Sequence, residues 1–496
     1  MTCVIGIDLG TSGVKAVLIG GDGDELAILG VRASSYSPDV ADGGCVQQEP
    51  SVWWEHTRAV LRELTRDFPD AEIAALAVSG QMHSSVFLDA DGGVIRPALL
   101  WNDTRTTEQT REIIELCGGE ARLLELVQNR ALEGFTLPKI LWLRKHEPQN
   151  FARLDKVVMP KDYINYRLTG RIATEVSDAA GTLLWDTRAR TWSLEMVAAM
   201  GLDASLLPTV LESLDVVGVV AADIARELGL PNGVRVIAGG ADNSCGAVAN
   251  GILEPGQAMV SVGTSGTVVA YLDALEGDVT GEVHLFSYSA PEADYAMGCM
   301  LSAGQCLNWL KENILTQYGY DELNALAEAS PCGANGLVFL PYLFGERCPH
   351  PDADARGVFF GLGAATSAGD MARAVLEGVA LNFAEMLALV ERFAPVRELY
   401  LTGGGARSAV WRQILADVLG RELIVSNVEE GAALGAGMLA LVGAGLAPSL
   451  KSAGERLISR DRVIVPNRDN AAVYAKSARV FSALYAAARD VFKLNK

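Results

Sequence analysis

The sequence predicts an α/β protein made of two similar halves. Strand-like apolar runs alternate with helical segments, which is typical of layered α/β folds. The tetrapeptide Gly-Thr-Ser-Gly occurs at 10–13 and again at 263–266, about half the chain further on, each time between two apolar runs. Half of the 496 residues are hydrophobic and 51 are glycine, as in a large globular protein with many tight turns.

The N-terminal half opens with a predicted strand–turn–strand unit. Residues 4–9 form a buried strand, the first Gly-Thr-Ser-Gly turn follows, and residues 14–19 return as a second strand. Further along, apolar runs and helical spacing predict a strand at 28–36, a helix at 52–68, and strands at 73–79 and 85–89.

The C-terminal half repeats this unit around the second Gly-Thr-Ser-Gly turn. After it, the pattern predicts a helix at 302–314, a strand at 337–343, a helix at 371–391, a strand at 397–402 and a helix at 408–419. We therefore expect an N-terminal domain at 1–247, a C-terminal domain at 248–445 and a helical C-terminal tail at 446–496.

The charge balance and the cysteines restrict the class of protein. The net charge of −20 disfavours binding to nucleic acid or to anionic membranes. The eight cysteines form no C-x-x-C pair, so zinc is not expected and the thiols are predicted to be reduced, as in a cytoplasmic protein. The N-terminus reads as a strand rather than a signal peptide, and the apolar stretch near 434–446 is too short to cross a bilayer.

The two Gly-Thr-Ser-Gly turns are candidate phosphate-binding loops. The chain has no G-x-x-x-x-G-K-[ST] motif, but glycine lets backbone N–H groups approach a phosphate closely. In the first turn, Thr11 and Ser12 add hydroxyl donors and Lys15 adds a positive charge; in the second, Gly263 and Thr264 occupy the same places. The alternative is a pair of ordinary hairpin turns.

Two aspartates are candidates for metal binding and catalysis. Asp8 stands at the end of the first strand, beside the first loop, where a carboxylate can anchor Mg²⁺ or simply cap a turn. Asp242 and Asn243 follow a buried strand and a glycine turn. A carboxylate there could accept the proton of an attacking hydroxyl, and an amide could bind a second hydroxyl. The alternative for this pair is an ordinary Asp-Asn turn, and residue spacing leaves the two interpretations equal.

Two further polar segments follow apolar runs. Gln81, Met82 and His83 come directly after the strand at 73–79 and suit recognition of a polyol by hydrogen bonds. The cluster from Trp101 to Arg105 reads equally well as a ligand contact or as a helix cap with surface ion pairs.

At these residues the chain resembles the FGGY carbohydrate kinases over nearly its whole length. Two long family signatures match, one at 134–143 and the other beginning at 357–362 and continuing through 370–377. The resemblance implies two ribonuclease-H-like domains of the actin/hexokinase type around a central catalytic cleft. It places sugar binding and the first phosphate loop in the N-terminal domain and nucleotide binding in the C-terminal domain.

The resemblance also implies a role for individual residues. Asp242 is the expected general base, and Asp8 and Asp242 are the expected Mg²⁺-associated carboxylates. The residues expected at the sugar are Met82, His83, Asp242 and Asn243. The residues expected at ATP are Thr11, Ser12, Lys15, Gly263, Thr264, Gly304, Asn308, Gly404, Gly405 and Ala406.

Within the family, local motifs are most similar to the xylulokinase branch. These motifs are Gly-Gln-Met-His at 80–83, Trp-Asn-Asp at 101–103, Pro-Lys-Asp-Tyr at 160–163, Ser-Asp-Ala-Ala-Gly-Thr at 177–182, Leu-Pro-Tyr-Leu at 340–343 and Gly-Glu-Arg at 345–347. They imply ATP- and Mg²⁺-dependent phosphorylation of D-xylulose to D-xylulose 5-phosphate by a cytoplasmic protein, with a homodimer as a further family-based expectation.

Two alternatives remain at this point. Ser84, Ala241, Ser244 and Cys245 depart from the usual residues around the sugar motifs, so a kinase for ribulose, gluconate or glycerol stays open. The second alternative is an actin- or Hsp70-like ATPase that acts as a nucleotide-driven binding module, because it would share the fold.

Overall fold

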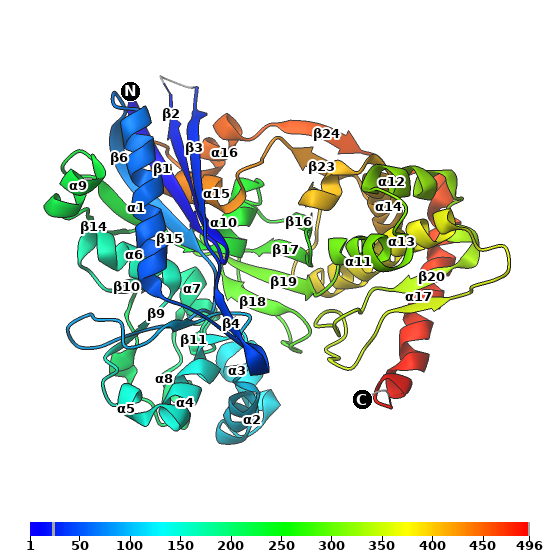
Figure 1. Cartoon of the computed structure of the whole chain (residues 1–496), viewed down its shortest axis with the longest axis horizontal. Coiled ribbons are helices and arrows are strands. Elements are labelled where there is room, and N and C mark those ends of the chain that lie inside the picture. The colour runs from blue at the N-terminus through cyan, green and yellow to red at the C-terminus, as the bar shows by residue number, and fades with distance from the viewer. Residues whose placement is uncertain (22–24, 495–496) are drawn as a thin grey trace.

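Two large β-sheets organise the molecule, and both are visible in Figure 1. The computed structural model describes residues 1–21 and 25–494. The six-stranded sheet has the order β14 (Val216–Val219), β15 (Arg235–Ala241), β6 (Glu72–Gly80), β1 (Thr2–Leu9), β2 (Gly13–Gly20) and β3 (Ala27–Ser35). The seven-stranded sheet has the order β18 (His284–Ser287), β19 (Asp294–Met300), β17 (Gly266–Leu272), β16 (Gln257–Val262), β22 (Glu398–Thr402), β23 (Leu423–Ser426) and β24 (Arg460–Ile464).

The two sheets repeat the same strand pairing. In the first, β1 pairs antiparallel with β2 and parallel with β6, which pairs parallel with β15. In the second, β16 pairs antiparallel with β17 and parallel with β22, which pairs parallel with β23. Beyond β15 in the first sheet and β23 in the second, an antiparallel strand, β14 or β24, forms the edge. The predicted pair of similar α/β halves is therefore confirmed, and both Gly-Thr-Ser-Gly turns lie at hairpin tips.

Helices cover the sheets and fill the space between them. The longer helices of the first half are α1 (Pro50–Asp67), α2 (Thr107–Leu116), α3 (Glu120–Val127), α4 (Thr136–His146), α6 (Pro160–Thr169) and α10 (Asp242–Ala249), with the shorter α5 (Pro148–Phe151), α7 (Val176–Ala180), α8 (Leu194–Ala199) and α9 (Ala222–Leu228). The α-helices of the second half, long and short, are α11 (Gly304–Trp309), α12 (Tyr320–Ala329), α13 (Ala368–Val390), α14 (Ala409–Leu419), α15 (Gly431–Gly443), α16 (Leu450–Leu457) and α17 (Ala471–Phe492). Within residues 1–21 and 25–494, none of the helices has the length and apolar character needed to span a bilayer.

Helix α15 joins the two halves although it comes late in the chain. It packs on the first sheet, against β1 and β6, and against α10. The approach is so close that a Cβ atom on Gly435 would lie 1.9 Å from the carbonyl oxygen of Cys245 in α10. Since real Cβ atoms do not come this near a backbone oxygen, the position requires glycine. The contact fixes α10, which begins at Asp242.

Several predicted segments differ from the observed ones at their ends. The predicted helix at 302–314 is α11 followed by a π-helical turn at Leu310–Ile314, and the predicted strand at 337–343 shrinks to β20 (Val338–Leu340). The prediction of a purely helical tail was incomplete, because the tail contributes β24 to the edge of the second sheet. The run Arg460-Asp461-Arg462-Val463-Ile464 has a charged start, as expected for an exposed edge strand, and this masks its strand character in the sequence.

Candidate active site

Asp242 stands where a buried strand meets a helix. Strand β15 ends at Ala241 and α10 begins at Asp242, so the carboxylate lies at the positive end of the helix dipole. The backbone N–H of Asn243 donates a hydrogen bond to Asp242 Oδ1 at 2.7 Å. The side chain stays partly accessible, so a ligand can reach it. The geometry suits a fixed proton acceptor at the edge of a sheet.

The acid–base properties of Asp242 match that role. Burial, and secondarily the negative charge of Asp8, raise the pKa of Asp242 to about 7, against the hydrogen bonds from the backbone of Asn243 and Met82. A general base is most effective when its pKa lies near the working pH. This elevated pKa distinguishes Asp242 from an ordinary turn aspartate, whose carboxylate would be solvated.

Asp8 forms the second half of a carboxylate pair. Burial raises the pKa of Asp8 to about 6, although the charge of Lys15 opposes the shift. Asp8 Oδ1 is buried and has no hydrogen-bond partner in the described part of the chain. An orphaned carboxylate oxygen beside a second carboxylate fits a hard divalent cation such as Mg²⁺. No cluster of three or more His, Cys, Asp or Glu that could hold a metal exists among residues 1–21 and 25–494.

The first predicted phosphate loop is held rigidly from two sides. Gly10 N–H donates to Gly13 O at 2.9 Å, which closes the turn, and the Tyr36 hydroxyl donates to Gly10 O at 2.7 Å. From the other side, the indole Nε1 of Trp101 donates to Thr11 Oγ1 at 2.9 Å. Trp101 therefore supports the loop. Asp103, in the same cluster, pairs with Arg105 at 2.8 Å, but this ion pair is buried rather than at the surface, and the Thr106 side chain before α2 makes no capping hydrogen bond in the part of the chain that the structure describes.

Lys15 has a partner that the sequence did not suggest. Its Nζ lies 3.1 Å from Glu430 Oε2, at the residue before α15, so the ion pair connects the two halves. Lys15 lines a polar cavity of about 810 Å³ together with Ala406, Arg407 and Arg412. Its predicted contact with phosphate stays a prediction, and in this structure Glu430 competes for the same ammonium group.

A second cavity, of about 590 Å³, collects most of the residues predicted at the nucleotide. Those are Gly263, Thr264, Gly304, Asn308, Gly404 and Gly405, whereas Ala406 lines only the neighbouring cavity. The sequence did not indicate the other residues that line this cavity. They include Tyr320, Asp321, Asn324, Arg407, Ser408 and Trp411. The start of α12 contributes three of these residues and carries no motif, so only its position in space brings it to the pocket.

Close backbone packing shapes this second cavity. Gly304 N–H donates to Gly263 O at 2.8 Å, and a Cβ atom on Gly304 would lie 2.6 Å from that same oxygen. The loop at the tip of β16 and the start of α11 are thus joined without side chains between them. Asn308 Oδ1 accepts the Tyr320 hydroxyl at 2.9 Å, which leaves the Asn308 amide N–H₂ free to meet a ligand.

His83 is held in one tautomer by the backbone. Its Nδ1 lies 2.6 Å from the carbonyl oxygen of Gly181, and since a carbonyl can only accept, Nδ1 carries the proton and Nε2 is an acceptor. Burial dominates in lowering the pKa of His83 to about 3, against that hydrogen bond, so the ring is neutral at physiological pH. The backbone of His83 has a φ of 68°, which is unusual for a residue other than glycine and is typical of functional positions.

Met82 and Asn243 lie together beside Asp242. Asn243 Nδ2 and the Tyr295 hydroxyl each approach Met82 Sδ at 3.7 Å. The ring of His83 packs against Phe135, with 4.7 Å between ring centroids. The structure thus brings together all the residues predicted at the sugar, and it adds Tyr295 on β19, which no sequence pattern indicated.

The unusual neighbours of Asp242 serve packing inside the protein. Ala241, Ser244 and Cys245 are all fully buried, and the Ser244 hydroxyl donates to Ser289 Oγ at 2.7 Å. A Cβ atom on the adjacent Gly240 would also collide with Ser289 Oγ. Ser244 therefore links α10 to residue 289, and the side chains of Ala241 and Cys245 are enclosed in the core.

Comparison with known proteins agrees with this geometry. The family model described as the FGGY family of carbohydrate kinases, N-terminal domain, matches residues 3–249, and the C-terminal domain model matches residues 258–444. The chain is 39% identical to the xylulose kinase of Bacillus subtilis, with 99% of this chain and 98% of that protein covered. It is 40% identical to the xylulose kinase of Lactococcus lactis, with 98% and 97% covered.

A solved structure agrees as well. The crystal structure of xylulose kinase from Rhodospirillum rubrum superposes with a TM-score of 0.92 at 30% identity, covering 99% of this chain and 100% of that one. The predicted fold class, two ribonuclease-H-like domains of the actin/hexokinase type around a cleft, is confirmed.

Proposed function

The chain belongs to the FGGY family of carbohydrate kinases, and on that premise we propose that it transfers the γ-phosphate of ATP to the O5 hydroxyl of D-xylulose. The products are D-xylulose 5-phosphate and ADP. The observation that carries the proposal is the placement of Asp242, with its raised pKa, beside Met82, His83 and Asn243. The named xylulose kinases that the chain matches over nearly its full length favour xylulose among the possible sugars.

The protein's own groups supply the chemistry at the acceptor. Asp242 takes the proton of the attacking hydroxyl, because it is a partly accessible carboxylate with a pKa near neutrality and lies beside the predicted sugar residues. The neutral His83 offers Nε2 as an acceptor for a sugar hydroxyl, and the Asn243 amide can both donate and accept. Holding the hydroxyl next to its base supplies much of the rate enhancement in phosphoryl transfer.

Binding of the nucleotide involves both halves. The residues at the 590 Å³ cavity hold the adenosine side, and the two Gly-Thr-Ser-Gly tips present backbone N–H groups to the phosphates. Asp8 and Asp242 would hold Mg²⁺, which, when bound, neutralises the charge that develops on the phosphates. Lys15 can reach the phosphates once it leaves Glu430.

Three further parts of the proposal concern the whole chain, namely its domains, its location in the cell and its oligomeric state. We infer a division into a sugar-binding domain at 1–247, a nucleotide-binding domain at 248–445 and a tail at 446–496, a cytoplasmic location, and a homodimer. Limited proteolysis, cell fractionation and light scattering test these three points separately. A monomer at micromolar concentration in light scattering would remove the homodimer without affecting the reaction.

The sugar panel is the decisive experiment. ADP release is measured by a coupled assay with D-xylulose, D-ribulose, D-gluconate, glycerol and no sugar. D-xylulose should give the highest kcat/KM. A clear preference for another acceptor would overturn the assignment of the sugar. ADP release that did not depend on any sugar would overturn the kinase proposal itself.

A further inference from the structure

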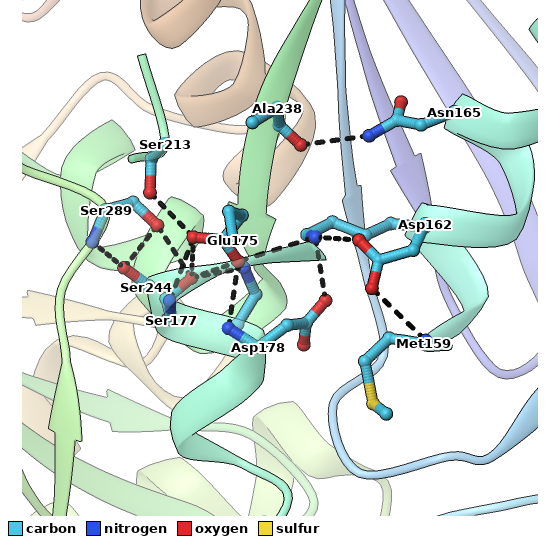
Figure 2. A network of polar contacts seen from close by, with 12 residues as sticks. Met159, Asp162, Asn165, Glu175, Ser177, Asp178, Ser213, Ala238, Ser244 and Ser289 are labelled. Atoms are coloured by element: carbon cyan, nitrogen blue, oxygen red, sulfur yellow. Dashed lines mark hydrogen bonds and ion pairs between the residues drawn. The ribbon is translucent and has the colours of Figure 1, made fainter. Parts of the chain in front are cut away.

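A chain of buried serine hydroxyls connects the start of α10 to a buried carboxylate. Figure 2 shows this network, in which Ser177, Ser213, Ser244 and Ser289 gather around Glu175. Glu175 ends β10 (Ala173–Glu175) and caps the N-terminus of α7, accepting from Ser177 N at 2.9 Å and Asp178 N at 2.8 Å. None of these residues belongs to the reaction described above, yet Ser177 contacts Ala241, directly before the base, and Ser244 lies two residues after it.

Counting protons fixes the direction of the hydrogen bonds. The Ser177 hydroxyl lies 2.8 and 2.9 Å from the two oxygens of Glu175, which as a carboxylate can only accept, so Ser177 donates its single proton there. Its lone pairs then accept Ala241 N–H at 2.9 Å and the Ser289 hydroxyl at 3.1 Å. Ser289 in turn accepts the Ser244 hydroxyl at 2.7 Å, and Ser244 accepts Ser289 N–H at 2.8 Å. Each serine hydroxyl in the chain therefore has an acceptor, and the chain ends on the carboxyl group of Glu175.

Lys161 places a positive charge beside Glu175 and two neighbouring carboxyl groups. Its Nζ is fully buried and lies 3.4 Å from Glu175 Oε1, 2.5 Å from Asp162 Oδ1 and 3.1 Å from Asp178 Oδ2. Asp178 forms no directed hydrogen bond through either oxygen in the described residues, and burial raises its pKa well above the ordinary range. Glu175, in contrast, accepts hydrogen bonds from two backbone N–H groups and two serine hydroxyls, so it is the carboxyl that anchors the chain.

The same short helix also supports the sugar side. Helix α7 carries Ser177 at its start, and the residue that follows it, Gly181, accepts the Nδ1–H of His83 at 2.6 Å. Ser177 holds Ala241, directly before Asp242, and Gly181 holds His83. One rigid element thus sets the positions of the base and of a predicted sugar ligand relative to each other.

We propose that Ser177, anchored by Glu175 and Lys161, is a positioning residue that aims Asp242 at the sugar hydroxyl through Ala241. The proposal rests on the proposed function in taking Asp242 as the base. Because Ser177 does not touch the substrates, its loss should misplace the base without weakening binding of sugar or ATP.

Ser177→Ala tests this proposal, and Ser213→Ala is its matched control. The Ser213 hydroxyl donates to the same carboxylate, Glu175 Oε2, at 2.7 Å and is equally buried, but it has no link to Ala241. With the sugar that wild type prefers, Ser177→Ala should lower kcat roughly 10- to 100-fold, the usual cost of a misplaced catalytic group, with both KM values unchanged. Ser213→Ala should retain the kcat of wild type.

A second readout does not depend on activity. Ala241 N–H is bound to Ser177 Oγ, so hydrogen–deuterium exchange of a peptide covering residue 241 should accelerate in Ser177→Ala and not in Ser213→Ala. If Ser177→Ala does not fold, Ser177→Cys, in which a weakly accepting thiol replaces the hydroxyl, should show both effects. Equal losses of kcat in the test and control variants, or unchanged kcat and exchange in the test variant, would overturn the proposal. If wild type phosphorylates no sugar, the proposed function fails, and the exchange experiment still decides the role of Ser177.

Discussion

At the scale of single residues, the environment of Asp242 supports its proposed role as the base. The sequence left an ordinary turn aspartate and a catalytic base equally open, because both follow a strand and a glycine. Burial and the nearby Asp8 raise the pKa of Asp242 to about 7, which a solvated turn aspartate would not show. The base interpretation therefore depends on tertiary structure that no residue pattern encodes.

Replacing the carboxylate should abolish most of the activity and leave the fold intact. Asp242→Asn keeps the size and polarity of the side chain but cannot accept the proton, so kcat should fall by about 10²- to 10⁴-fold. Circular dichroism should match wild type, and the melting temperature should be equal or higher, because the substitution removes a carboxylate that burial disfavours. A variant with more than a tenth of the activity of wild type would show that another group takes the proton.

The pKa of Asp242 also predicts how the rate depends on pH. The base works as a carboxylate, and protonation at a pH below about 7 removes it in the free enzyme. The value of kcat/KM for the sugar should therefore be flat above pH 8 and fall about tenfold per pH unit well below pH 7. Initial rates between pH 5 and 9 in buffers of constant ionic strength measure this profile. An acid limb near pH 4 would mean that Asp242 has an ordinary pKa in the working enzyme.

At the scale of elements, the strands at the sheet centres were predictable and the supporting elements were not. Residues 4–9, 14–19 and 73–79 appeared as strands because their apolar runs lie in the buried middle of the first sheet. Helix α7 and strand β24 left no such signal, since α7 spans only Val176–Ala180 and β24 is exposed. Likewise, Tyr295 and Ser289 come to the site through contacts between residues that are far apart in the sequence. No periodic pattern of residues indicates such contacts.

The contact between α15 and α10 gives a test at this scale. Gly435→Ala places a Cβ atom 1.9 Å from Cys245 O, so the helices must separate, and the free energy of unfolding should fall by about 1–3 kcal/mol, as in other overpacked cores. Because α10 carries Asp242, kcat should fall as well. Gly246→Ala is the matched control: this glycine lies on α10, a Cβ atom there meets nothing within 4 Å, and the change should stabilise the helix by up to about 1 kcal/mol. Urea unfolding compares the two variants, and equal stabilities would contradict the role assigned to this contact.

At the scale of the whole molecule, the duplicated sheets explain why a four-residue repeat was informative. Each Gly-Thr-Ser-Gly turn lies between the first two strands of an equivalent sheet, so the repeat marks the same point of the same topology. The two halves differ at the position two residues before the turn, which is Asp8 in the first half and Ser261 in the second. Two matching scaffolds thus carry different groups, with the two carboxylates at the first sheet and the cavity of about 590 Å³ at the second.

The ion pair between Lys15 and Glu430 connects these two scaffolds and should limit binding of ATP. If Lys15 serves the phosphates, it must first leave Glu430, whose own charge also repels them. Glu430→Gln should therefore lower the KM for ATP about 2- to 5-fold, in line with the modest energy of a partly exposed pair, and leave the KM for the sugar unchanged. Glu429→Gln is the matched control, because it removes the same charge from the same cavity but leaves the ion pair between Lys15 and Glu430 in place. An equal decrease in both variants would indicate a general effect of charge, whereas an unchanged KM in Glu430→Gln would place Lys15 outside the nucleotide site.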